Sequence, residues 1–477
     1  MATTIYNLID AQRRNSGSIY FPPESDYSSG RQIQNSYLLQ RLNLKIKNGQ
    51  QVSLAEVFQT MEIYEDIYVN AIHGSIEILD VSGGFSKFAI TGGETISMVA
   101  CKSLDNPEIL IDRDDLIVYQ VTDFVYVEKV SRFKLHFISK SGLQAQKKRL
   151  YKTFVNERRI SNLIKSIYRE IASESDLYVN LNDSTCVIDK DFVSPGQAPL
   201  DAIDTLTKRA CVSGDYYLFF ERLAKLQNKK HFLVSTKTMK NKQGAFTSPE
   251  LYIAYNITTQ NFTPAGTVYR AAQVSFVDNY NHIENMMAGL YNSTIKIVDI
   301  TSRSYIDMKV NYLDETSSSQ QAIESNNYFA SYQNFFPEQP GERVIAKGTN
   351  DVISNSGGWL KVDLINGVIL SMFRLIVDMP GNNVLGTGNY VNLSMPSAEA
   401  ISLNIGAGVV HTDPVYSGKY LITAVKHTFT NKEYIKKIEL SRMENTYNID
   451  SAINGGGGGG YGFGGETGGG YDGGGGY

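Results

Sequence analysis

Cysteine is scarce in this chain of 477 residues, and the few cysteines are too scattered to organise a fold. Cys101, Cys186 and Cys211 form no CxxC pair. They therefore indicate neither a disulfide framework nor a cysteine zinc cluster. We interpret them as small buried hydrophobic side chains.

Long hydrophobic runs and a strong charge bias are also missing. The most apolar stretch, residues 368–379, is interrupted by Arg374 and is too short to cross a bilayer. The N-terminus has no basic start followed by an apolar run, so we expect no classical signal peptide. With 45 basic and 49 acidic side chains the net charge is −4. That balance argues against a protein that coats nucleic acid, which would carry a basic excess.

The usual signatures of catalysis are absent from the sequence. The chain has six histidines and no HExxH, and His411 and His427, the closest two, are sixteen residues apart. It also has no GxSxG or GxxxxGK[ST] motif. We therefore predict no catalytic, cofactor-binding or metal-ligating residue, no cofactor and no enzyme activity. His427 is interpreted as a packed or hydrogen-bonded strand residue.

Two charged clusters allow a functional and a structural interpretation. Asp112, Asp114 and Asp115 could supply a carboxylate pair for acid and base chemistry, but we favour a solvated turn. The stretch from Arg222 to Ser248 carries seven basic residues and no acidic one. It could meet an acidic partner or nucleic acid, but we favour an exposed tip of a β-hairpin.

Aromatic residues are plentiful, with 30 Tyr and 21 Phe against one Trp and 12 Pro. Rings suit the half-buried surface of a sheet, so we expect a mainly β protein of the α+β class. Changes in pattern predict an N-terminal arm (1–35), a first β domain (36–150) and an α/β module (151–213). They also predict a second β domain (276–450) with an insertion at 314–358, and a disordered Gly/Tyr-rich tail (451–477). Strands in 214–275 are expected to complete the first β domain.

The α/β module is predicted from a change in hydrophobic period. Ile160, Leu163, Ile164, Ile167, Tyr168 and Ile171 fall on one face of a helix. A second helix is expected to begin at Pro199, because proline suits the first turn.

The two β domains contain an internal echo. ITGGETISM (90–98), LIVYQV (116–121) and RFKLHF (132–137) are followed, in the same order, by LGTGNYVNLSM (385–395), GKYLITAV (418–425) and KKIELS (436–441). Met98 and Met395 are 297 residues apart, Tyr119 and Tyr420 301, and Leu135 and Leu440 305. The echo predicts two copies of one β fold.

Three segments resemble a known family. Residues 195–221 resemble a proline-led helix that ends in Arg-Ala before an aromatic strand. Residues 276–305 resemble the bridge into a second β domain, and residues 416–429 resemble its penultimate hairpin. The chain thereby resembles, over residues 36–445, the central hub of contractile phage baseplates. This T4-like family is related to late-control tail proteins and to the N-terminal part of type VI secretion spike proteins.

The resemblance implies a structural virion protein, assembled in the host cytoplasm, with two β-barrel or sandwich domains like those of a tail tube. Three chains would form a ring of six such domains, which joins the sixfold tail tube to the threefold central spike. The implied partners are two further copies, the tube protein, the spike, and the tape-measure and baseplate wedge proteins. No membrane contact and no sequence-specific nucleic-acid binding are implied. The alternatives are the hub of a type VI-like injection system and a tail-associated wall hydrolase.

Overall fold

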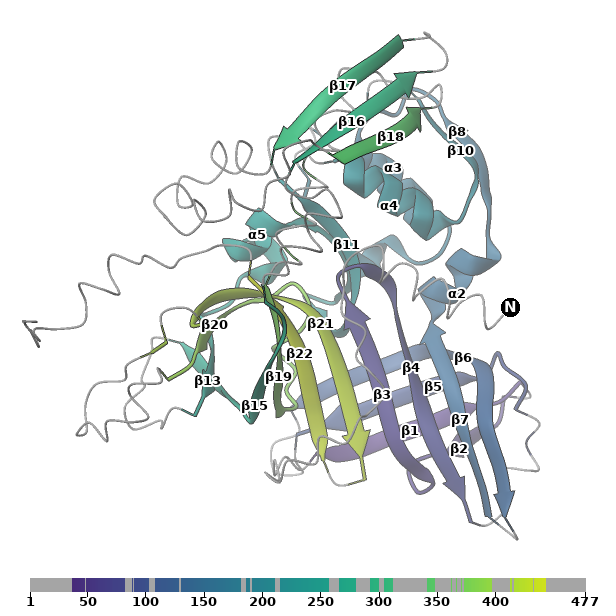
Figure 1. The fold of residues 1–477 in the computed structure, drawn as a ribbon. Coiled ribbons are helices and arrows are strands. Elements are labelled where there is room, and N and C mark those ends of the chain that lie inside the picture. The colour runs from purple at the N-terminus through teal and green to yellow at the C-terminus, as the bar shows by residue number, and fades with distance from the viewer. Residues whose placement is uncertain are drawn as a thin grey trace, which may run out of the picture.

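The computed structural model is dominated by one 14-stranded sheet (Figure 1). It describes residues 37–47, 49–81, 88, 90–102, 108–127, 130–181, 186–188, 191–210, 215–256, 266–279, 292–299, 304–311, 341–347, 362, 366, 370, 373–396, 412–413, 416–431 and 433–442. The expected N-terminal arm and Gly/Tyr-rich tail lie outside these residues. The mainly β prediction is confirmed.

The first half of the large sheet is built from the N-terminal strands. These are β1 (Leu38–Lys45), β2 (Gln51–Ser53), β3 (Phe58–Asp66), β4 (Val69–Asp80), β5 (Thr95–Cys101), β6 (Ile109–Val127) and β7 (Val130–Ser139). Along β4 and β7 buried and more exposed residues alternate over much of the strand. Their buried side chains form a core that includes Ile76, Leu135 and Phe137.

The second half is built from strands of the C-terminal part. These are β13 (Leu251–Tyr255), β14 (Thr267–Ala271), β15 (Gln273–Asn279), β19 (Phe373–Pro380), β20 (Tyr390–Ser394), β21 (Gly418–Thr430) and β22 (Tyr434–Ser441). They enclose a separate core that includes Leu375, Ile422 and Leu440. The large sheet therefore packs on two cores, one mainly from each half, and Phe429 and Tyr434 of the second half join the first core.

The two halves share one topology. In the first, the strand order is β3-β4-β7-β6-β5, and in the second it is β15-β19-β22-β21-β20, with every neighbouring pair antiparallel. We call these two five-strand sets the first and the second repeat. The sequence echo is thus confirmed in the order of the strands.

The register of the strands agrees as well. Val121 lies opposite Leu135 in the first repeat, and Ile422 lies opposite Leu440 in the second. Val121 and Ile422 are 301 residues apart and Leu135 and Leu440 are 305 apart, the same separations as in the sequence echo. The pair Tyr126 and Ser131 has its counterpart in His427 and Lys436. The β5 segment is one residue out of step, because Leu393 lies opposite Gly418 where the echo would place residue 417.

The strands that flank the repeats differ. β1 runs antiparallel to β5, whereas β13 runs parallel to β20, through Tyr252 opposite Asn392. The sequence predicts that strands in 214–275 complete the first β domain. Among the described residues, β13 and β14 join the second repeat, to which β15 also belongs, and the remaining strands of that range form a separate sheet.

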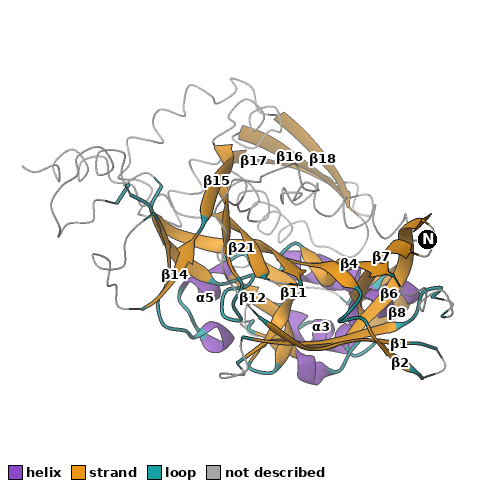
Figure 2. Cartoon of the chain, turned by 90° about the horizontal axis from the view of Figure 1, so that it is seen from below, coloured by secondary structure: helices purple, strands orange, loops and turns teal. Residues whose placement is uncertain are grey.

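That separate sheet belongs to the α/β module. β11 (Tyr217–Leu226) pairs with β12 (Lys229–Ser235), which pairs with β9 (Leu177–Val179). Around them lie α2 (Lys140–Lys147), β8 (Leu150–Phe154), α3 (Ile160–Tyr168), η2 (Glu174–Asp176), β10 (Phe192–Gln197), α4 (Pro199–Arg209), α5 (Thr236–Lys240) and η3 (Gly244–Phe246). Both helix predictions are confirmed, since the apolar face of α3 is buried and Pro199 opens α4. Figure 2 shows the helices near β11 and β12.

A further small sheet stands apart from the module (Figure 2). Its strands are β16 (Asn292–Asp299), β17 (Ser304–Asn311) and β18 (Gly341–Lys347), in the order β17-β16-β18. β18 lies inside the expected 314–358 insertion, and the rest of that segment is outside the described residues. Within the described part of the chain, no helix is long and apolar enough to cross a membrane.

Candidate functional site: the joint between the repeats

The two repeats are joined edge to edge by β3 and β21. β21 pairs with β20 only over Gly418–Leu421, and beyond that point β3 takes the place of β20 at the edge of β21. The pairing is antiparallel and runs from Ala424 opposite Asp66 to Thr430 opposite Thr60. Figure 1 shows the yellow strands of the second repeat beside the purple β3. One strand of the first repeat thus extends the sheet of the second.

A buried group of charged side chains lies at this joint. Glu65 of β3 accepts hydrogen bonds from the backbone N–H of Leu223 at 2.8 Å and from His427 Nε2 at 3.3 Å. His427 Nδ1 lies 2.8 Å from the Tyr434 hydroxyl. Lys436 Nζ donates to the carbonyl oxygen of Leu385 at 2.5 Å. All four side chains are 3% exposed or less. The joint is therefore fixed by buried polar contacts as well as by strand pairing.

Burial and charge set the protonation of this group. Burial would raise the pKa of Glu65, but the hydrogen bond from His427 and the nearby positive charges outweigh it and lower the pKa to about 2. Burial lowers the pKa of His427 to about 4, so this histidine is neutral at pH 7. Burial also lowers the pKa of Lys436 to about 7, against the attraction of Glu65. An ionised carboxylate therefore stands at the centre of the joint.

Arg222 of β11 ties the module to the same joint. Its side chain is buried, its Nη2 donates to the carbonyl oxygen of Val384 at 3.4 Å, and its guanidinium lies 5.9 Å from the centre of the Phe246 ring. Its Nε and Nη1 are buried and have no hydrogen-bond partner among the residues that the structure describes. Burial lowers the pKa of Arg222, and the attraction of Glu65 opposes that shift. The charge of Arg222 is thus held in place chiefly by Glu65.

A second buried group connects β11 with the first repeat. Glu221 accepts hydrogen bonds from Arg113 at 2.5 Å and from the Ser139 hydroxyl at 2.6 Å. Arg113 also pairs with Asp115 at 2.8 Å, and Lys230 lies 2.8 Å from the other oxygen of Asp115. Burial would raise the pKa of Asp115, but Arg113 and Lys230 lower it to about 2. These contacts fix the position of the module on the first repeat.

Ser141, His231 and Glu221 lie close together but do not have the geometry of a catalytic triad. The Ser141 hydroxyl and the Glu221 carboxylate both face His231 Nε2, at 3.3 and 3.6 Å. His231 Nδ1 faces the Tyr168 hydroxyl at 2.8 Å, whereas a triad needs a carboxylate there. All three side chains are buried. We interpret the group as structural.

The sequence interpretation of Asp112–Asp115 as a turn was wrong. These residues lie inside the long strand β6, where Asp112 and Asp114 are exposed and Arg113 is 1% exposed. Alternation along a strand places Arg113 and Asp115 on the inner side, where they meet Glu221 and Lys230. Charged residues in an alternating strand look like a polar turn when their buried partner is far away in the sequence.

The basic stretch forms a hairpin, as predicted, but its charges are not all at an exposed tip. Gln227 and Asn228 form the turn between β11 and β12, with φ of 52° and 61°, as a two-residue hairpin requires. Arg222 is buried, and Lys242 lies 2.8 Å from Glu250. His427 is a buried, hydrogen-bonded strand residue, as the sequence predicted. The parts of Glu65, Glu221 and Lys436 were not foreseen.

No group of three or more His, Cys, Asp or Glu side chains in the described residues could hold a metal ion. No family model matches the chain, and no curated protein matches its sequence. Solved structures do resemble its fold. One is a tail protein from Neisseria meningitidis MC58, with 9% identity and a TM-score of 0.48, covering 85% of this chain and 97% of the other.

Two further solved structures have a similar fold. The 43 kDa tail protein of prophage MuSo2 from Shewanella oneidensis has 9% identity and a TM-score of 0.49, and the likeness covers 85% of this chain and 98% of that one. A type VI secretion component from E. coli has 10% identity and a TM-score of 0.44, covering 85% and 78%. In each case the similarity is one of fold.

Proposed function

We propose that this chain is a non-enzymatic structural hub of a contractile phage tail, in which three copies form a ring of six β repeats. The observation that carries the proposal is the duplication: two repeats with the same strand order and register, joined edge to edge within one chain. A ring of three such chains offers six similar surfaces to a sixfold tail tube and three identical chains to a threefold spike. The duplication thereby lets one ring match both the sixfold symmetry of the tube and the threefold symmetry of the spike.

The proposal divides the chain by task. The two β domains build the ring, and the α/β module stabilises it. β11 of the module contacts the joint through Arg222 and Leu223 and the first repeat through Glu221. The proposed limits are 36–150 for the first β domain, 151–213 for the α/β module and 276–450 for the second β domain. β11 and β12 add to the module, and β13 and β14 add to the sheet of the second repeat. Tube and spike proteins are the proposed partners, with the tape-measure and wedge proteins beside them, in a virion assembled in the host cytoplasm.

Mass and image together test the proposal. Light scattering on the purified chain, alone and with its cognate spike protein, is expected to give a species of three chains. Averaged electron-microscope images of that species should show a ring with six lobes and a threefold axis. A chain that stays monomeric under both conditions contradicts the proposal. Clearing of a peptidoglycan suspension by the chain alone would replace the structural role with that of a wall hydrolase.

A further inference from the structure

Each of the two strands that form the joint within the chain has a counterpart in the other repeat. In the joint, the edge strand β3 of the first repeat is added to β21 of the second, beyond the end of β20. By strand order and register, β15 is the counterpart of β3, and β6 is the counterpart of β21. The chain therefore has a second strand of the β3 kind and a second strand of the β21 kind.

Both counterparts have a free edge among the described residues. β15 pairs with β19 on one side and with no strand on the other. β6 pairs with β5 as far as Ile117, and Val118 still exchanges backbone hydrogen bonds with Gly93 and Glu94 ahead of β5. From Gln120 to Val127 its strand partner among the described residues is β7. The free stretch of β6 corresponds to the part of β21 that receives β3.

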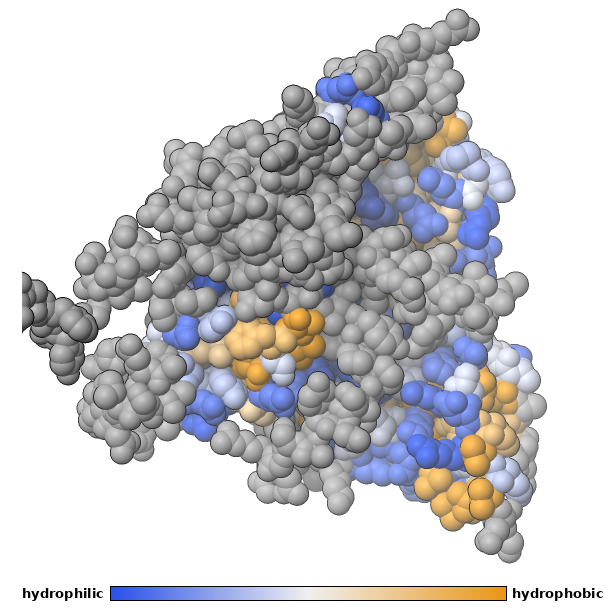
Figure 3. Space-filling model, in the orientation of Figure 1, coloured by the Kyte–Doolittle hydropathy of each residue, from blue (hydrophilic) through white to orange (hydrophobic). Residues whose placement is uncertain are grey.

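The free end of β6 is apolar and exposed. Phe124, Val125, Tyr126 and Val127 are 63%, 52%, 63% and 61% exposed, and none of the four is charged. Proteins that keep an edge strand single usually protect it with charges, proline or a covering loop. Figure 3 shows hydrophobic residues gathered at the lower right, where Figure 1 draws the end of the β6–β7 hairpin. An exposed apolar edge without such protection is typical of a strand that pairs with another chain.

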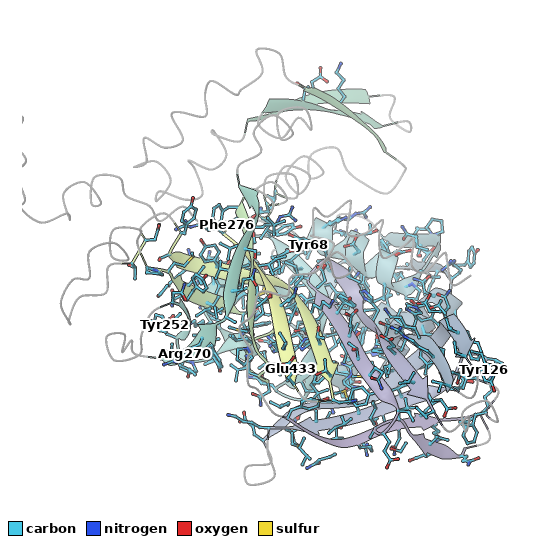
Figure 4. All side chains as sticks on the ribbon, turned by 60° about the horizontal axis from the view of Figure 1, so that its bottom comes forward. Tyr68, Tyr126, Tyr252, Arg270, Phe276 and Glu433 are labelled. Atoms are coloured by element: carbon cyan, nitrogen blue, oxygen red, sulfur yellow. The ribbon has the colours of Figure 1, made fainter. Side chains whose placement is uncertain are left out.

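β15 also exposes apolar side chains, with Phe276 and Val277 44% and 40% exposed. It cannot meet β6 within one chain, because the two lie at different ends of the molecule. Figure 4 shows Tyr126 at the right-hand edge, pointing outward, and Phe276 well away from it. Any pairing between these two edges has to join two chains.

We propose that β15 of one chain adds antiparallel to the free edge of β6 in the next chain, and so repeats between chains the joint that β3 and β21 make within one. The internal joint also supplies the register. Glu62 lies opposite Thr428, and Ile63 opposite His427. The equivalent positions place Asp278 of one chain opposite Val127 of its neighbour, and Asn279 opposite Tyr126.

This inference rests on the proposed ring and names the strands that close it. Each chain offers one donating edge, β15, and one accepting edge, β6. Such a head-to-tail contact continues until the ends meet in a ring or, if they do not meet, grows into a filament. Within a ring of three chains, joints inside and between chains alternate, so all six repeats are held by one kind of strand addition.

Cross-linking and a matched pair of lysine variants test the inference. A chain with Val127→Cys and Asp278→Cys is expected to give covalent dimers and trimers on mild oxidation, and Val127→Cys alone should not. The double variant Tyr126→Lys, Val127→Lys is expected to lose the trimer in light scattering. The control, Tyr151→Lys with Val155→Lys, changes the same residue types at positions 79% and 62% exposed outside the large sheet and should keep it.

The outcomes separate the joint from the ring. A wild-type trimer that persists in Tyr126→Lys, Val127→Lys and gives no 127–278 cross-link overturns the β6–β15 joint and leaves the hub proposal standing. A wild-type chain that is monomeric in every condition, with or without the spike, overturns both. Circular dichroism confirms that each variant is folded, and a variant that unfolds is replaced by Phe124→Lys at the same exposed edge.

Discussion

Lys426 Nζ of β21 lies 2.8 Å from Glu62 Oε1 of β3, so an ion pair crosses the joint between the two repeats. Burial would raise the pKa of Glu62, but Lys426 outweighs it and lowers the pKa below its usual value. Lys426 is 4% exposed at its side chain, and Glu62 17%. Contacts of this kind make the joint specific for two particular strands, because either charge would be left unpaired in a shifted register.

Replacing Glu65 should be the most damaging single change at the joint. Glu65→Gln removes the charge that balances Arg222, and we expect it to lower the free energy of unfolding by about 3 kcal/mol. Urea unfolding followed by circular dichroism measures the loss. The control is Glu77→Gln, whose partner Arg132 is 62% exposed at its side chain, and which should cost less than about 1 kcal/mol. Equal losses of unfolding free energy in both variants would show that the buried network stabilises the fold no more than an exposed ion pair does.

Lys436 predicts a rise of stability with pH. Its pKa is about 7 in the folded chain and near 10.5 when unfolded, so between these values the unfolded state binds more protons. Stability should therefore increase from pH 7 to about 9.5. The window stops there because burial raises the pKa of Tyr434, which favours unfolding once free tyrosines ionise near pH 10.

The variant Lys436→Met should flatten this dependence. We expect its melting temperature to change less than that of the wild type between pH 7 and 9.5, as measured by differential scanning fluorimetry. Glu65 stays ionised throughout the window, because its pKa is about 2. Parallel curves for the two proteins would mean that Lys436 does not titrate in this range.

The two separate cores predict independent losses of stability. Leu135 and Leu440 are both 0% exposed and occupy equivalent positions. Leu135→Ala and Leu440→Ala should each lower the free energy of unfolding by about 2–5 kcal/mol. Because they lie in different cores, the double variant should show the sum of the two losses within about 0.5 kcal/mol. A clear excess or deficit in urea titrations would show that the cores are coupled.

Gly74 of β4 should tolerate no side chain. A Cβ at this position would overlap the carbonyl oxygen of Glu62 in β3 and the ring of Phe137 in β7. We expect Gly74→Ala to lower stability by about 1–3 kcal/mol or more. Adding Phe137→Leu should not restore it, since the Glu62 carbonyl belongs to the strand pairing itself. Full rescue in a thermal melt would show that only the ring was in the way.

The sequence allowed the duplication to be predicted but not the joint. The repeats were detectable because Val121, Leu135, Ile422 and Leu440 lie in apolar segments whose spacing survives in the strand register. The joint depends on Glu65, an acidic residue that alternation alone would assign to either face. Its partners are contributed by strands more than 150 residues away. The parallel pairing of β13 with β20 was equally hidden, because a short apolar strand carries no mark of its direction.

The flanking strands make the two repeats unequal in a way that bears on what can bind them. β1 is antiparallel to β5 and β13 is parallel to β20, although the five strands beside them match. In the proposed ring, a ligand that rests on the shared strands would meet the same backbone at every sixty-degree step. One that reaches the flanks would meet two unlike surfaces in alternation, and could bind only at every second position.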